Sequence, residues 1–111
     1  GTDAGPLDFE AALDDTIAYA EAYFRDADRD AIRQLGNEYL VRTVPDGDDA
    51  TLQEVLARPL RIAAESPDAE CAGSKFQEQI LAEFAALEFF DLDGWVFSTT
   101  ELGLAAALTL A

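Results

Sequence analysis

The closing stretch DLDGWVFSTTELGLAAALTLA (91–111) constrains the fold of this chain more than any other segment. From Leu102 to Leu110 it carries leucine or alanine at seven positions. A helix that is apolar nearly all round must be buried on several sides. At about 12 residues it is too short to cross a bilayer, which takes roughly 20 residues. We therefore expect either the central helix of a small helical domain or a docking helix for a partner.

The start of this helix is marked by a capping-box sequence that runs from Ser98 to Glu101. The Ser98 hydroxyl can accept a hydrogen bond from the Glu101 N–H, and the Glu101 carboxylate can accept one from the Ser98 N–H. The two residues thus fix where the final helix begins.

A turn glycine and an extended lead-in come before the cap. Gly94 closes the turn, and strand-like alternation places Trp95 and Phe97 on one side and Val96 on the other. We expect Trp95, Phe97, Leu102 and the cap at residues 98–101 to build the core that shapes a docking surface, with Leu104 as a further structural or interaction residue. A partner anchor is the alternative role for Trp95.

Apolar residues spaced by three and four predict further helices in the rest of the chain. They cover residues 8–25, a segment from a cap at 26–28 to about Val44, a short helix from Thr51 that Pro59 limits, and residues 74–90 after a Ser74 cap. Gly36, inside the second helix, is expected to mark a close helix crossing or a break.

The expected fold is all-α: a small bundle of four to five helices with a buried C-terminal helix. Residues 1–7 are expected to be a disordered or extended lead, and residues 8–111 a single helical domain. Residues 58–73 are predicted to be the least regular part, because two prolines and a glycine interrupt them. No strand is expected beyond a brief pairing at residues 95–97.

The chain is strongly acidic, with 23 acidic and 7 basic residues, no histidine and a formal net charge of −16. Such a surface repels phosphate backbones and anionic lipid headgroups, which argues against binding to nucleic acid or membrane insertion. The acids alternate with apolar residues, so they do not form a disordered tail. Adaptation to high salt and an acidic protein from a high-GC genome are both compatible with this composition.

Candidate catalytic and metal-binding groups are sparse. Nucleophilic catalysis needs a base, and the chain has no histidine and one lysine, Lys75. Cys71 lies beside Glu70, whose charge disfavours the thiolate. The acidic loop at residues 46–49 fails the EF-hand pattern, because threonine and alanine occupy its sixth and twelfth positions. We therefore predict no catalytic residue, no cofactor site and no metal site.

The segment Asp93-Gly94-Trp95-Val96-Phe97-Ser98-Thr99-Thr100-Glu101 resembles the C-terminal "DGWVLSRTEARLCALAAL" ending of a family of small bacterial helical proteins. That family includes the sorbitol dehydrogenase small subunit and gluconate 2-dehydrogenase subunit 3 type. Residues 32–40 resemble its "LGxxYL" helix, and residues 49–56 its "DAATLxxLL" stretch. The chain departs from the pattern at Thr99 and Gly103, where the family often has Arg, and at Ala105, where it has Cys.

The resemblance implies export by the twin-arginine route and a periplasmic location. It also implies a non-catalytic accessory subunit, without flavin, that binds a larger FAD-dependent dehydrogenase. The alternative is a free-standing acidic helical interaction or structural domain that is salt-adapted or forms homodimers.

Overall fold

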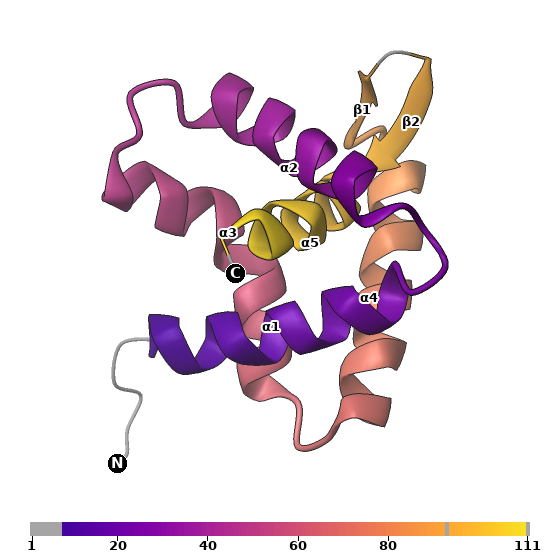
Figure 1. Cartoon of the computed structure of the whole chain (residues 1–111). Coiled ribbons are helices and arrows are strands. Elements are labelled where there is room, and N and C mark those ends of the chain that lie inside the picture. Colours follow the sequence, from indigo (N-terminus) through magenta and orange to yellow (C-terminus); the bar gives the residue numbers. More distant parts are fainter. Residues whose placement is uncertain (1–7, 93, 111) are drawn as a thin grey trace.

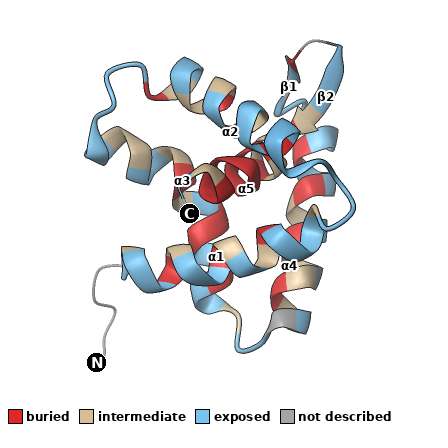
Figure 2. Ribbon diagram, viewed as in Figure 1, coloured by how far each residue is buried: buried red, intermediate tan, exposed pale blue. Residues whose placement is uncertain are grey.

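The C-terminal helix α5 (Thr99–Thr109) is the centre of the computed structural model, which describes residues 8–92 and 94–110. It packs against α1, α2, α3 and α4, and its residues 102–108 are all buried (Figures 1 and 2). This arrangement confirms the expected all-α fold with a buried C-terminal helix. The expectation for residues 1–7 lies outside the described residues.

Four longer helices and a β-hairpin surround α5 in the described part of the chain (Figure 1). They are α1 (Phe9–Tyr23), α2 (Arg29–Thr43), α3 (Asp49–Glu65), α4 (Ala69–Ala85), β1 (Phe89–Leu92) and β2 (Trp95–Ser98). The first four helices each begin after an aspartate whose carboxylate accepts an N–H of the first turn: Asp8, Asp28, Asp48 and Asp68. Part of the acidic excess therefore caps helices, where negative charge also suits the helix dipole.

The core consists of two groups of buried side chains that meet at α5. Leu104 of α5 belongs to the group that contains Phe76 of α4. Leu102 belongs to the other group, which contains Leu56 and Leu60 of α3. Burying each of these large side chains stabilises the fold by about 1.5–3 kcal/mol. Because both groups include residues of α5, loss of that helix would separate the rest of the core.

Gly36 lies where α2 crosses α5. A Cβ atom at this position would lie 2.4 Å from Thr109 Oγ1 and 2.5 Å from the Ala105 carbonyl oxygen. The two backbones can approach this closely only at a glycine. The expected close crossing is confirmed, whereas the alternative of a helix break is wrong because α2 continues to Thr43.

The expectation that Pro59 limits a short helix is wrong. Helix α3 continues through Pro59 to Glu65, and α4 begins at Ala69 rather than after Ser74. Pro59 is buried, and its Cγ lies 3.0 Å from the position of a Cβ atom on Gly103 of α5. Contact with α5 offsets the backbone hydrogen bond that proline cannot donate. The predicted irregular segment thus contracts to the short α3–α4 connection.

The last predicted helix also ends earlier than its apolar spacing indicates. Helix α4 stops at Ala85, and Leu87 adopts a left-handed conformation with φ of 62°. The Leu87 and Glu88 N–H groups donate to the carbonyls of Phe84 and Glu83, which is the Schellman pattern of helix termination. The chain can then turn back into β1, which pairs with β2 along its full length and so exceeds the brief pairing expected.

Trp95 does not contribute to the core, so that part of the prediction is wrong. It is 71% exposed at the start of β2, beside the hairpin turn. The turn holds Gly94 at a φ of 86°, and the Gly94 N–H donates to Asp91 Oδ1 at 3.0 Å. The hairpin projects beyond the helices (Figure 1), which leaves too few neighbours to cover an indole at its tip.

Candidate docking site

The predicted site residues fall into two sets with different environments. Ser98, Glu101 and Leu104 support the fold: the Glu101 N–H donates to Ser98 Oγ at 3.1 Å, and the Ser98 N–H donates to Glu101 Oε1 at 2.9 Å. This confirms the capping box, and Leu104 has no exposed surface. Trp95 and the half-buried Phe97 instead lie on the hairpin, at the surface of the molecule.

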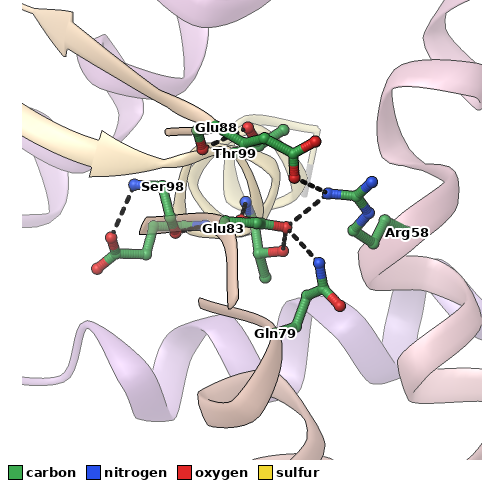
Figure 3. Close-up of polar contacts among 8 residues, drawn as sticks. Arg58, Gln79, Glu83, Glu88, Ser98 and Thr99 are labelled. Carbon is green, nitrogen blue, oxygen red and sulfur yellow. Dashed lines mark hydrogen bonds and ion pairs between the residues drawn. The ribbon is translucent and has the colours of Figure 1, made fainter. Parts of the chain in front are cut away.

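Sequence reasoning missed the most heavily bonded polar group of the structure, the fully buried Glu83 of α4 (Figure 3). Its oxygens accept the Thr100 N–H at 2.6 Å and the Thr100 hydroxyl at 2.5 Å. They also accept Gln79 Nε2 at 2.9 Å and Arg58 Nη1 at 2.8 Å. The carboxylate lies at the N-terminus of α5, where the helix dipole favours negative charge. One side chain therefore links α3, α4 and α5.

A sequence signal for Glu83 exists. It follows the buried residues Phe76 and Ile80 at helical spacings of seven and three, so it occupies the buried face of α4. An acid in an apolar stripe indicates a buried charge with dedicated partners, because an unpaired one is too costly.

The environment of Glu83 keeps it ionised. Burial by itself raises the pKa of Glu83, but hydrogen bonds from Thr100, Gln79 and Arg58 lower that pKa further than burial raises it. The pKa of this carboxyl therefore lies below its ordinary value. This carboxylate has no exposed surface and its oxygens are occupied by hydrogen bonds. It therefore cannot contact a substrate, and its role is to hold α3, α4 and α5 together.

Glu88 reinforces the same junction (Figure 3). Its carbonyl oxygen accepts the Thr99 N–H at 3.2 Å and the Thr99 hydroxyl at 3.0 Å. Its carboxylate lies 3.4 Å from Arg58 Nη1. The end of α4 and the start of α5 are thus fastened by both backbone and side-chain contacts, which fixes the base of the hairpin between them.

Tyr23 connects α1 to the start of α5. Its hydroxyl donates to Glu101 Oε2 at 2.6 Å, so the capping carboxylate is shared between two helices. Partial burial, this hydrogen bond and repulsion by the Glu101 charge all raise the pKa of Tyr23 above its ordinary value. The phenol therefore stays protonated and keeps donating at neutral pH.

An apolar groove of about 540 Å³ runs between α2 and the hairpin, and we call it the α2–hairpin groove. Its lining consists mainly of apolar side chains: Phe24, Ala27, Ala31, Ile32, Leu35, Leu92, Trp95 and Phe97, together with Gln34 and Glu38. The lining residues on α2 extend from Ala31 to Glu38, which is about 10 Å along the helix axis. The groove is therefore long enough to contact two turns of another helix.

The hairpin register explains the apolar wall of the groove. Leu92 pairs with Trp95, and Phe90 pairs with Phe97. Because paired residues share a face and alternate residues along a strand share a face, these four side chains lie together. The same register confirms that Trp95 and Phe97 lie on one side of the strand and Val96 on the other.

Metal-binding side chains are not clustered in the described part of the chain. No three cysteine, histidine, aspartate or glutamate side chains within residues 8–92 and 94–110 are grouped to hold a metal ion. In the predicted acidic loop, Asp48 accepts the Thr51 N–H and hydroxyl, so it caps α3. None of the helices described has the length and apolar character needed to cross a membrane.

Comparison of the chain with models of protein families found no match, and comparisons with curated proteins and with solved structures found no significant similarity.

Proposed function

We propose that this protein is a non-catalytic accessory subunit that binds a larger protein through the α2–hairpin groove. The proposed partner is an exported FAD-dependent dehydrogenase, and the proposed location is the periplasm. On this proposal the chain itself holds no cofactor and performs no chemistry.

The observation that carries the proposal is the exposure of Trp95 beside an apolar groove. An indole that is 71% exposed leaves a large apolar surface in water, which is unfavourable for the isolated chain. Tryptophan is among the residues that contribute most to protein–protein binding, usually in contact with a pocket near the centre of the interface. Covering Trp95 and the groove together would remove both from water.

The core supports this role by holding the hairpin in place. Hydrogen bonds connect the two ends of the hairpin to α3, α4 and α5, and they involve Arg58, Glu83, Thr99 and Thr100. A docking surface that is already ordered loses less conformational entropy on binding than a flexible one. The hydrogen-bond network around Glu83 thus keeps the docking surface ordered, although none of its atoms needs to contact the partner.

The partner class is supported by the sequence resemblance, whose residues 94–101 form part of the hairpin turn, β2 and the capping box. In the family that this segment resembles, the small subunit accompanies a large flavoprotein subunit during export.

Affinity purification of the tagged chain from its native host tests the proposal. We expect a larger protein with flavin absorbance to copurify with the unaltered chain and to be lost with Trp95→Ala. Val41→Ala is the matched control, because Val41 is 70% exposed on α2 but does not line the groove. Copurification of only the chain itself, or equal recovery with Trp95→Ala, would contradict the proposal.

A further inference from the structure

We propose that the α2–hairpin groove binds an amphipathic helix whose apolar face enters the groove and whose flanks carry lysine or arginine. This inference rests on the proposed function, because it specifies the segment of the partner that docks.

The shape of the groove favours a helix over an extended segment. One wall is helix α2, and the other is the apolar face of the hairpin that carries Leu92, Trp95 and Phe97. Apolar side chains of a docking helix recur at spacings of three and four, so anchors at positions i, i+4 and i+7 extend over about 10 Å. That length matches the stretch of α2 from Ala31 to Glu38 that lines the groove.

The negative charge of the chain favours basic residues on either side of the apolar face of the docking helix. Glu38 is the charged residue among the described lining residues and pairs with Arg42 at 3.1 Å, and Asp26, Asp28 and Asp30 are exposed around the end of the groove at Ala27. The arginines at positions 25, 29 and 33 are exposed beside these acids, so the attraction comes from the formal net charge of −16 on the whole chain. Basic flanks would therefore be attracted before contact and would face carboxylates after docking.

The same charges argue against a second copy of this chain as the occupant. Two grooves that face one another would bring together two chains that each carry a formal net charge of −16. Like charges facing each other across an interface suppress association.

Three synthetic peptides of about 18 residues test the inference, since shorter isolated helices are only marginally stable. The first carries leucines at i, i+4 and i+7 with lysine and arginine on the other face. The second replaces these basic residues by glutamate, and the third is the basic peptide with two central prolines. Trp95 is the only tryptophan, so a blue shift of its emission reports docking, and anisotropy of a labelled peptide gives the affinity.

We expect the basic helical peptide to bind at least about tenfold more tightly than either control peptide, with an affinity that falls as salt rises. Equal binding of the proline-containing peptide would overturn the inference, because general attraction between opposite charges would then explain the binding. Equal binding of the acidic peptide, or no binding of the basic one, would also overturn it.

Two substitutions in α2 locate the binding. Ala31→Arg introduces bulk and positive charge into the groove, whereas Val41→Arg adds the same charge at an exposed position outside it. We expect Ala31→Arg to weaken peptide binding about tenfold or more and Val41→Arg to change it little. Equal effects would show that net charge rather than the groove controls binding, which contradicts the inference.

The proposed function and this inference can fail separately. A copurifying flavoprotein that depends on Trp95, with none of the three peptides bound, would leave the accessory role intact and reject the basic helix. A bound basic peptide without any copurifying flavoprotein would retain the groove specificity and reject the proposed partner.

Discussion

Glu83 shows how one buried charge organises the centre of this protein. Transfer of a carboxylate out of water is costly, and its partners compensate only when the geometry is good. Here the donors come from α3, α4 and the first turn of α5. Because three elements converge on one side chain, the charge specifies how these helices are arranged.

Glu83→Gln should lower the free energy of unfolding by about 3 kcal/mol. The amide retains the shape of the side chain, but it removes the charge and brings a donor towards the Thr100 N–H and Arg58. Chemical denaturation measures the change. Glu88→Gln is the matched control, because the half-exposed Glu88 pair should contribute less than about 1 kcal/mol. Equal effects of the two substitutions would show that the buried network has no special role.

The pH dependence of stability provides a second test of Glu83. The pKa of Glu83 is lower in the folded chain than its ordinary value of 4.5. As the pH falls below 4.5, the unfolded state therefore binds more protons than the folded state. The stabilisation is therefore present above pH 4.5 and is lost as the pH falls through the lower, folded value. We expect the free energy of unfolding to decline less steeply on acidification in Glu83→Gln. If the free energy of unfolding falls equally steeply with pH in both proteins, the pKa of Glu83 is not lowered by folding.

At the scale of elements, the crossing of α2 and α5 depends on the absence of a side chain at Gly36. Gly36→Ala should lower the free energy of unfolding by about 1–3 kcal/mol, because its Cβ would overlap with atoms of α5. Gly73→Ala, inside α4, should instead raise stability by about 1 kcal/mol, because its Cβ would make an ordinary 3.6 Å contact with Tyr19. Thermal melts of both variants measure the contrast, and a stabilising Gly36→Ala would rule out the close crossing.

Elements that depend on local chemistry could be predicted from the sequence. The capping box at Ser98 and the cap within residues 26–28 can be predicted because the cap and its target lie within one turn. Residues 102–110 also predict a buried helix by themselves, because a helix that is apolar nearly all round has no polar face to expose.

Elements that depend on distant contacts could not be predicted in this way. Helix α3 passes through Pro59 because Pro59 packs near Gly103, which is far away in sequence. Strand β1 forms because Leu87 turns the chain at a position where glycine is the usual residue. Of the candidate site, the residues Trp95 and Phe97 were identified, but the α2 wall and Glu83 emerged only from the packing of the helices.

The whole molecule combines a dense apolar core with a strongly acidic surface. With a formal net charge of −16, repulsion among surface carboxylates opposes the folded state at low ionic strength. We expect the melting temperature to rise as sodium chloride increases from about 10 mM to about 1 M, because the Debye length falls from about 30 Å to about 3 Å. Potassium chloride should give the same rise, and a melting temperature that falls with both salts would contradict this account.

On the proposed function, the acidic domain acts by presenting the α2–hairpin groove to another protein. Photo-cross-linking in the native host tests it most directly, with a benzophenone amino acid at position 95 and, as a control, at position 41. We expect a cross-link from position 95 to a larger protein and little or none from position 41. Equal cross-linking from both positions, or cross-links from position 95 only to other copies of this chain, would contradict it.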